Sequence, residues 1–460
     1  MPEERRGCTF NFGRSSLERK AEILEESNHA ASDDKIDSLI ANALNQLSLD
    51  EREAVYYEMH GVAEITKETP ELVQFSLNQL EAELDRIKHT HPKGSAYKLA
   101  EDLSPDYVQD HELRMKFLRC EKFDIQKTSE RFIRYFACKL LFFGKEKLCK
   151  NITLQDLNKD DLKALKAGYM QVLPIRDRSG RAVWIGLPRH QTFKIPNNKY
   201  RALFYLCEAM AEDIETQRRG ITFVVYNVGS FEKEKYDSSA TEHTITIQNS
   251  LPAKACSLHY CFNDSGFRYV VNIAMHFLNE DLKSRAKVHF GTHLECSYSL
   301  MTFGCPVHSL PVSIDGDLKR KAHLEFIKMR HQQEMRVGLP RIIVPTLDDV
   351  LFGRGILAVL DLTVLRSGKP YRQHAANVKL HAMMEAELKY EESSVLKGKR
   401  QSTIEKLMEA ITNGGGRFLQ QDNGGCWVEL DEKVVQEKVG RAFRTRLRNA
   451  SSELKQQNKL

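Results

Sequence analysis

The sequence predicts an α/β fold in which a mostly parallel β-sheet is covered by helices, with a helical lobe before it and a separate small α+β domain after it. Between residues 168 and 290, short apolar runs rich in β-branched residues alternate with helical patterns, which is typical of parallel strands joined by crossover helices. From about residue 342 the chain has its own apolar set and two glycine clusters, so a further domain is expected there. A length of 460 residues accommodates two or three domains of roughly 150 residues each.

The N-terminal part of the chain is first polar and then helical. Residues 1–32 show no sustained hydrophobic period and are expected to form a disordered tail. From Asp33 onward apolar residues recur three and four positions apart, and the pattern resumes after Pro70, so residues 33–95 are predicted to be helical. Up to Pro105 the chain has 12 lysine and arginine residues against 21 aspartate and glutamate residues, which makes this region acidic.

Two further helices and five strands follow in order. Residues 110–144 carry a helical apolar stripe, with Asp124 placed to cap the second helix and Gly144 placed to end it. The hydrophobic period changes after Gly168, which marks the start of the sheet. Strand-like runs lie at 170–174, 182–187, 221–228, 256–262 and 286–290, with helical patterns at 200–214 and 266–278 between them.

The chain beyond the sheet is basic, with 26 lysine and arginine residues against 18 acidic residues from Asp317 onward. Residues 319–341 are predicted to form a charged linker helix whose sparse apolar anchors are Leu324, Ile327 and Met335. In the final predicted helix, Val435, Val439, Phe443 and Leu447 form a stripe, and Lys438, Arg441, Arg444 and Arg448 lie elsewhere around it. Such a helix fits nucleic acid, an acidic lipid surface or an acidic protein, and a solvated helix docked by its stripe is the simpler interpretation.

Composition excludes several classes of protein. Hydrophobic residues make up 41% and charged residues 28% of the chain, so neither wholesale disorder nor a fibrous repeat is expected. No apolar run approaches the roughly 20 residues of a membrane span. The start of the chain lacks an apolar stretch behind its charges, so a secretory signal is not expected. The ten cysteines are therefore predicted to be thiols, mostly buried as small hydrophobic residues.

Signals for catalysis or metal binding are weak throughout the sequence. The cysteines form no CxxC pair, residues 331–334 lack the HExxH spacing, and neither a nucleophile with a base nor paired carboxylates stand out. The Gly353-Arg354-Gly355 run lacks the spacing of a phosphate-binding loop. We therefore expect no catalytic residue, no metal site and no enzyme activity.

The run RMKFLRCEKFD at residues 114–124 carries a family resemblance. It resembles the RFLRARKFD signature in the helical N-terminal lobe of CRAL-TRIO proteins, a lipid-binding family that includes tocopherol, retinaldehyde and phosphatidylinositol transfer proteins. Residues 177–183 resemble the family's D-x-x-G-R-P-V turn between its first two strands, and residues 221–228 resemble its central strand. Further features follow in the family's order at 251–252, 256–262, 267–278, 287–290, 310–311 and 315–316. The resemblance spans about residues 98–318.

This resemblance implies a pocket that is floored by the sheet, closed by a mobile apolar helix, and shields one lipid molecule from water. Shielding is needed because apolar surface exposed to water costs about 25 cal/mol per Å². The resemblance implies no cofactor besides the bound lipid, and transient contact with a membrane surface. The alternative for the apolar helix is an ordinary buried helix of the sheet. The expected pocket or gate residues are Phe267, Val270, Val271, Ala274, Phe277 and Leu278.

Two basic residues are candidates for contact with a lipid head group. Lys287 stands where some phosphatidylinositol-binding members place a lysine on the inositol phosphate, and Arg119 belongs to the FLR motif whose basic residues contact phosphate in some members. A solvated lysine and a surface ion pair are the alternatives at these positions. Glu121 replaces the second basic residue of the motif, and Ala253 replaces an acidic residue of phosphatidylinositol binders. The lipid therefore stays open between a phospholipid and an isoprenoid-type lipid.

The C-terminal region resembles an uncharacterised domain family found mainly in algal proteins, through residues 349–355, 415–419 and 427–429. That resemblance implies a domain boundary and no activity. The predicted units are a tail over 1–32, an acidic helical region over 33–95, a CRAL-TRIO N-terminal lobe over 96–150, a lipid-binding domain over 165–318, a linker helix over 319–341 and a C-terminal domain over 342–449.

The sequence thus predicts a cytoplasmic protein, with peripheral attachment to membranes left open, that binds one hydrophobic lipid in a closed pocket and transfers or senses it between membranes. The alternative hypothesis is a nucleic-acid or protein-interaction adaptor that acts through the basic C-terminal domain.

Overall fold

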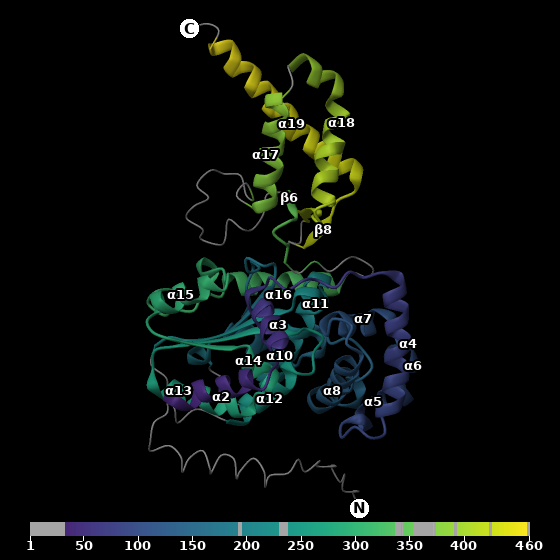
Figure 1. Cartoon of the computed structure of the whole chain (residues 1–460), viewed down its shortest axis with the longest axis vertical. Helices are drawn as coiled ribbons and strands as arrows, with labels where there is room; N and C mark the ends of the chain where they lie inside the picture. The colour runs from purple at the N-terminus through teal and green to yellow at the C-terminus, as the bar shows by residue number, and fades with distance from the viewer. Residues whose placement is uncertain are drawn as a thin grey trace, which may run out of the picture.

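The computed structural model describes residues 33–191, 196–229, 238–335, 342, 344–352, 371, 374–390, 393–422 and 426–457, so the predicted tail lies outside the described residues. A five-stranded sheet in the order β1-β2-β3-β4-β5 forms its centre (Figure 1). The β1–β2 pairing is antiparallel and the other three pairings are parallel. The strands are β1 (Met170–Val172), β2 (Ala182–Gly186), β3 (Ile221–Asn227), β4 (Ala255–Phe262) and β5 (Ala286–Phe290). They coincide with the predicted runs to within one residue at each start, which confirms the α/β fold.

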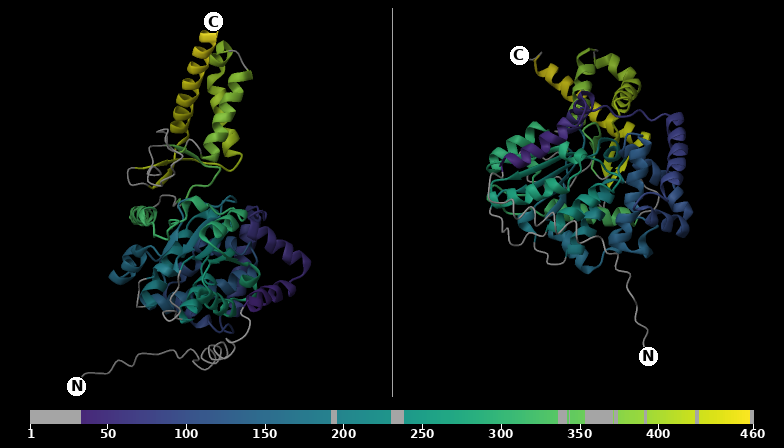
Figure 2. Two further views of the ribbon diagram at one scale, coloured as in Figure 1. Left: turned by 90° about the vertical axis from the view of Figure 1, so that its left-hand side faces the viewer. Right: turned by 60° about the horizontal axis from the view of Figure 1, so that its bottom comes forward.

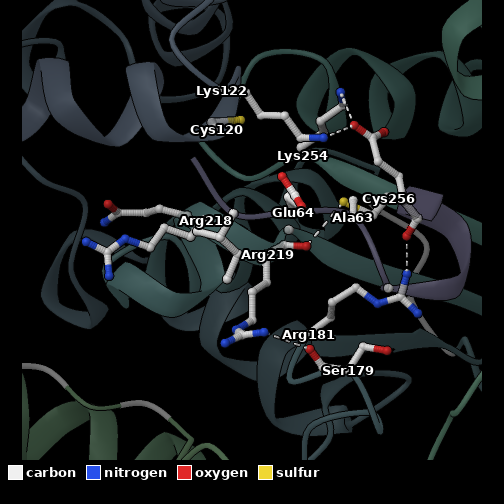
Figure 3. A pocket seen from close by; sticks show the side chains of 15 residues that line it. Ala63, Glu64, Cys120, Lys122, Ser179, Arg181, Arg218, Arg219, Lys254 and Cys256 are labelled. Carbon is white, nitrogen blue, oxygen red and sulfur yellow. Dashed lines mark hydrogen bonds and ion pairs between the residues drawn. The ribbon is translucent and has the colours of Figure 1, made fainter. Parts of the chain in front are cut away.

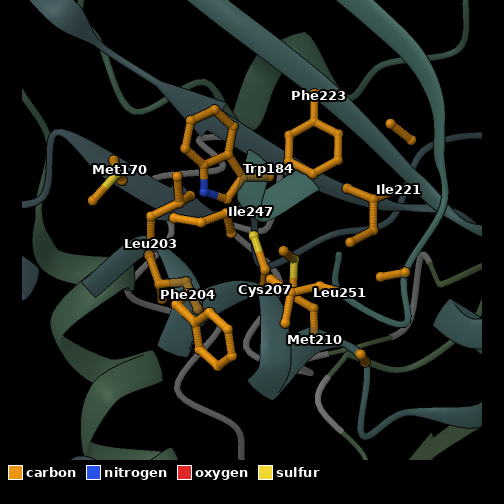
Figure 4. Packing of buried hydrophobic residues seen from close by; sticks show 14 of the residues in the cluster. Met170, Trp184, Leu203, Phe204, Cys207, Met210, Ile221, Phe223, Ile247 and Leu251 are labelled. Atoms are coloured by element: carbon orange, nitrogen blue, oxygen red, sulfur yellow. The ribbon is translucent and has the colours of Figure 1, made fainter. Parts of the chain in front are cut away.

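Helices fill the connections between the parallel strands. They are α10 (Pro196–Met210), α11 (Ile214–Arg219), α12 (Ser238–Gln248), α13 (Ser265–Phe277) and α14 (Glu280–Ser284). Figure 4 shows Trp184 and Phe223 of the sheet beside Leu203 and Phe204 of α10, with Ile247 of α12 close to them. All five side chains are buried. Because strand side chains alternate between the two faces, every second sheet residue contributes to this apolar layer.

The opposite face of the sheet is more polar. It is covered by α3 (Leu49–His60), which contacts β4, and by α15 (His293–Thr302), which contacts β4 and β5. Thr222, Ser257 and His259 are fully buried there. The Ser257 hydroxyl donates to the Thr222 hydroxyl oxygen at 3.1 Å, and the Thr222 hydroxyl donates to Asp177 at 3.1 Å. The buried hydroxyls of Ser257 and Thr222 are thus paired across neighbouring strands, and Asp177 completes the chain of hydrogen bonds.

A helical lobe packs beside the sheet and is held together by aromatic rings. Its helices are α4 (Pro70–Ile87), α5 (Gly94–Leu103), α6 (Pro105–Gln109), α7 (His111–Cys120) and α8 (Ile125–Phe143). The Phe117 and Phe132 rings meet edge to face with centroids 4.9 Å apart, and Phe132 meets Phe136 at 5.2 Å. As predicted, the Asp124 carboxylate caps α8, accepting from the Lys127 backbone N–H, and the helix ends at Gly144.

The predicted acidic helical region divides between the lobe and the sheet. α4 contacts α7 and α8 of the lobe, whereas α2 (Asp33–Asn45) contacts α13 and α14 on the far side of the molecule. Between them, α3 lies on the polar face of the sheet. Hydrophobic periodicity predicted that these helices exist, but it carries no information about which surface each one covers.

Residues 321–334 form α16 (Lys321–Glu334), and this helix is docked rather than free. It contacts α9 (Lys159–Ala167) and β1, and its buried residues include Phe326, Met329 and Arg330. Of the predicted anchors, Ile327 is buried, whereas Leu324 and Met335 are exposed. The anchor prediction was therefore wrong for two of three residues, because polar side chains of α16 are buried as ion pairs.

The C-terminal region has a small sheet in the order β6-β7-β8 and three helices that stand away from the α/β body (Figures 1 and 2). The strands are β6 (Val350–Phe352), β7 (Phe418–Gln421) and β8 (Trp427–Glu429), and the helices are α17 (Ala375–Tyr390), α18 (Ser393–Thr412) and α19 (Glu432–Gln457). Val435, Val439 and Phe443 of the predicted stripe are buried in one cluster. The side chains of Leu447 and Arg448, and the Gly353-Arg354-Gly355 run, lie outside the described residues.

Among the described residues, no helix has the length and apolar character needed to cross a membrane. Nine cysteines are described, and all except Cys149 are buried, as predicted.

Candidate functional site

The predicted gate helix exists as α13, and its apolar residues face inward. The Asp264 carboxylate caps it, accepting from the Gly266 backbone N–H at 2.7 Å. Five of the six predicted residues are buried and the sixth, Phe277, packs at the edge of the same core; the five are Phe267, Val270, Val271, Ala274 and Leu278. α13 contacts β4 and α12, and α2 also contacts it. The structure therefore places the six residues together along α13 and at its C-terminal end, packed against the apolar core.

Strand alternation places the predicted head-group lysine on the other side of the sheet. In β5, Val288 packs against the apolar core, so the neighbouring Lys287 points to the polar face. Its charge lowers the pKa values of His60 and His289, both of which are also lowered by burial. Lys287 thus lies near the end of α3, away from α13.

Arg119 is engaged in ion pairing. Its guanidinium donates to both carboxylate oxygens of Glu68, at 3.0 Å from Nε and 3.0 Å from Nη2, and to the Gln217 side-chain oxygen at 3.0 Å. Arg218 donates to the same glutamate at 2.7 Å. Arg119 and Lys287 therefore have different partners, and their role as head-group contacts stays a prediction.

A cluster of cations that sequence reasoning missed surrounds Glu58 of α3. The carboxylate of Glu58 lies 2.7 Å from Lys122 Nζ, 3.3 Å from Lys254 Nζ and 2.5 Å from Arg285 Nη2. Burial alone would raise the pKa of Glu58, but Lys254, Arg285 and Lys122 together hold it well below its usual range. We call Lys122, Lys254 and Arg285 the basic cluster. Its members are up to 163 positions apart, and only Lys122 belongs to a sequence motif that could have drawn attention to it.

A small cavity of about 40 Å³ lies beside the basic cluster (Figure 3). Its lining includes Lys122, Lys254, Arg181 and Arg219, with Glu64 as a further acidic residue. A larger cavity of about 380 Å³ lies at the carboxyl ends of the parallel strands, where the Tyr226 hydroxyl contacts His293 Nδ1 at 2.7 Å. None of the six predicted gate residues lines either of these two cavities among the described residues.

Two histidines pair on the polar face of the sheet. His259 Nδ1 lies 3.0 Å from His289 Nε2, and the rings stack with centroids 5.2 Å apart beneath Phe303. A single N–H shared between two ring nitrogens requires the accepting imidazole to be neutral. Burial, the facing histidine, Arg181 and Lys287 hold the pKa of His259 well below its usual range, and burial and Lys287 lower that of His289 to about 4.

We expect folding stability to fall as the pH is lowered from about 6.5 to about 4. The unfolded chain binds protons at these histidines in that window while the folded chain does not, so stability falls by up to about 1.4 kcal/mol per pH unit for each site. Urea unfolding at pH 7, 6 and 5 measures this slope. His289→Gln keeps a hydrogen-bonding group without the titration and should flatten the slope, whereas the exposed His111→Gln should not. Equal slopes for His289→Gln and the unmodified protein would contradict the prediction.

Comparison with known proteins finds separate matches for the central sheet with α13 and for the C-terminal region. Residues 166–304, which include the whole central sheet and α13, match the CRAL/TRIO domain, and residues 363–445 match a domain of unknown function, DUF6824. Two similar proteins are named alpha-tocopherol transfer protein-like, from Homo sapiens and Pongo abelii. Each is 23% identical over 236 residues, a segment that covers 50% of this chain and 63% of the relative.

These matches support lipid binding in general and name no ligand for this chain. They offer no support for a nucleic-acid or protein partner of the C-terminal region. The chain therefore contains a CRAL/TRIO domain at residues 166–304 and, separately, a DUF6824 domain at its C-terminal end.

Proposed function

We propose that this protein binds one lipid molecule between the sheet and α13, and transfers or senses it between membranes as a binding protein rather than an enzyme. The observation that carries the proposal is that the CRAL/TRIO match covers the sheet together with α13, whose buried apolar strip faces the apolar layer. A lipid held there exchanges its water-exposed apolar surface for protein contacts. We place this activity in the cytoplasm, at the periphery of membranes.

The proposal extends to the class of lipid. A phospholipid or an isoprenoid-type lipid fits the apolar layer, and phosphatidylinositol is the candidate whose anionic head group the basic cluster, on the α3 side of the sheet, would attract. Three cations face the carboxylate of Glu58 there, and Arg285 also pairs with Asp281 at 2.6 Å, so the three cations exceed these two carboxylates by one charge. An anionic head group would be attracted to this excess. Native mass spectrometry of the purified full-length chain, with extraction of any bound lipid, tests both parts. A protein that arrives empty and takes up no lipid from vesicles would contradict the proposal.

We expect Ala274→Trp to weaken uptake of a lipid from vesicles about 10- to 100-fold, because an overpacked core costs about 1–3 kcal/mol and each 1.4 kcal/mol is tenfold in affinity. Ala274 lies on the buried strip of α13 with Phe267 and Val271. The matched control is His276→Trp, which adds the same ring at an exposed position of the same helix. Uptake of fluorescent phosphatidylcholine measures both. Equal uptake by the two variants would show that the strip does not line the lipid site.

A further inference from the structure

α2 lies on α13, the predicted gate helix against which the proposed function places the lipid, and on α14, which follows it. It contacts both α13 and α14, although more than 200 residues separate them in the sequence. The contact is made by an apolar strip at helical spacing: Ile36 and Ala43 are buried, and Leu39 and Ile40 are half-buried. Asp37 and Ser38, on the other side of α2, are exposed. α2 thus covers the outside of the gate while presenting a polar surface to water.

The next helix is fixed much more firmly than α2. Arg181 Nη1 donates to the backbone oxygens of Glu58 and Met59, at 2.7 and 2.9 Å, and the Ser179 hydroxyl donates to the oxygen of His60 at 3.1 Å. The His60 ring stacks on Phe303 with centroids 5.0 Å apart. The Glu58 carboxylate is held by the three cations of the basic cluster. α3 is therefore anchored through its C-terminal residues 58–60, and α2 is joined to its other end.

α2 is a short helix, like α3, and a short turn connects the two. It has 13 residues, and residues 46–48 join it to α3. An isolated helix of this length is marginal in water, so α2 depends on its contact with α13 and α14. The conformational entropy lost when α2 becomes ordered offsets much of the free energy gained from that contact. The free energy needed to detach α2 is therefore small, and α3 can stay in place when α2 detaches.

A buried polar group on α13 also favours separation of the helices around it. Asn272 is buried although its position on α13 is opposite the sheet-facing strip, and α2 and α12 are helices that contact α13. Its side-chain oxygen has no hydrogen-bond partner among the described residues. A buried unpaired oxygen disfavours the closed arrangement, and it recovers water when the helices around α13 separate.

We propose that α2 is a latch on the gate: docked, it holds α13 and α14 closed over the apolar layer, and detached, it leaves them free to open while α3 remains anchored. This inference rests on the proposed function, because it assigns α13 to the gate. The latch controls how often the site opens and not which lipid it accepts.

The test adds a charge to the docked face of α2 in the full-length protein. Ile36→Asp and Ala43→Asp place a carboxylate where α2 meets its partners, and Ser38→Asp places the same carboxylate on the exposed face as the matched control. We expect both docked-face variants to increase hydrogen exchange of the 265–284 amides by about tenfold or more, because burying an unpaired charge is costly. Transfer of fluorescent phosphatidylcholine between phosphatidylcholine vesicles should accelerate in the same variants, and Ser38→Asp should match the unmodified protein.

Two results would overturn the latch. One is unchanged exchange of residues 265–284 in both docked-face variants. The other is an increase spread equally over all strands, which would make α2 an ordinary part of the core. If exchange rises only in 265–284 while no variant, nor the unmodified protein, transfers or binds any lipid, then the latch contact is supported and the proposed function is what fails.

Discussion

Replacing Arg181 with methionine should lower the free energy of unfolding by about 3–5 kcal/mol, the cost of leaving one member of a buried ion pair without its partner. The side chains of Arg181 and Asp177 are 2% and 0% exposed, and Arg181 Nε donates to Asp177 at 2.6 Å. The same carboxylate also accepts from the backbone N–H groups of Ser179 and Arg181, each at 2.9 Å. Without the guanidinium, this carboxylate stays buried and α3 loses the donor to its last carbonyls.

Urea unfolding followed by the fluorescence of Trp184 and Trp427 measures this effect, since one tryptophan lies in the central sheet and the other in the C-terminal sheet. The control is Arg178→Met in the same turn, where the side chain is exposed and a change within about 0.5 kcal/mol is expected. Adding Asp177→Asn to Arg181→Met should recover part of the loss, because the unpaired charge is then removed. A loss for Arg181→Met no larger than that for Arg178→Met would contradict the argument.

This turn illustrates what the sequence could and could not predict. Residues 177–183 were predicted to hold the turn between the first two strands, and residues 177–181 lie in that connection just before β2, with Gly180 at φ 79° where a side chain would be strained. The cap on α8 and the positions of all five strands were also predictable, because each depends on residues close together in the chain. The contact of Arg181 with α3 was not, because it joins positions 122 and 123 apart.

In the candidate site, too, features set by nearby residues could be predicted and contacts between distant residues could not. The apolar strip of α13 repeats at helical spacing, so its six residues could be named in advance. The direction of Lys287 depends on strand alternation and on which face α13 covers, and the basic cluster depends on three segments that meet only in the fold. The covering of α13 by α2 is equally distant in sequence. Local periodicity predicts elements and their apolar faces, while the partners of buried charges are determined by tertiary structure.

Arg330 of α16 is another buried charge whose partners could not be predicted from local sequence. Replacing it with methionine should lower the free energy of unfolding by about 3–5 kcal/mol. Its side chain is 1% exposed; Nη1 contacts Glu212 at 2.7 Å and Nη2 contacts Glu334 at 3.1 Å. The Tyr205 hydroxyl donates to the same Glu334 at 2.7 Å. Removing the guanidinium leaves two nearly buried carboxylates without their shared cation, so α16 should separate from the α/β body. A charged helix that looks solvated in sequence is thus docked by its charges.

Loss of the Arg330 ion pairs should also affect the C-terminal region, because residues of that region contact α16. Gln333 donates to the backbone oxygen of Ile342 at 3.2 Å, and the Cys426 thiol lies 3.5 Å from the backbone oxygen of Met329. Limited proteolysis should therefore cut residues 321–334 faster in Arg330→Met. Lys328→Met, an exposed position on the same helix, is the control and should leave both cleavage and urea stability nearly unchanged. If the two variants were equally stable and equally resistant, the Arg330 ion pairs would not be what docks α16, and its apolar residues Phe326, Ile327 and Met329 would have to account for the docking.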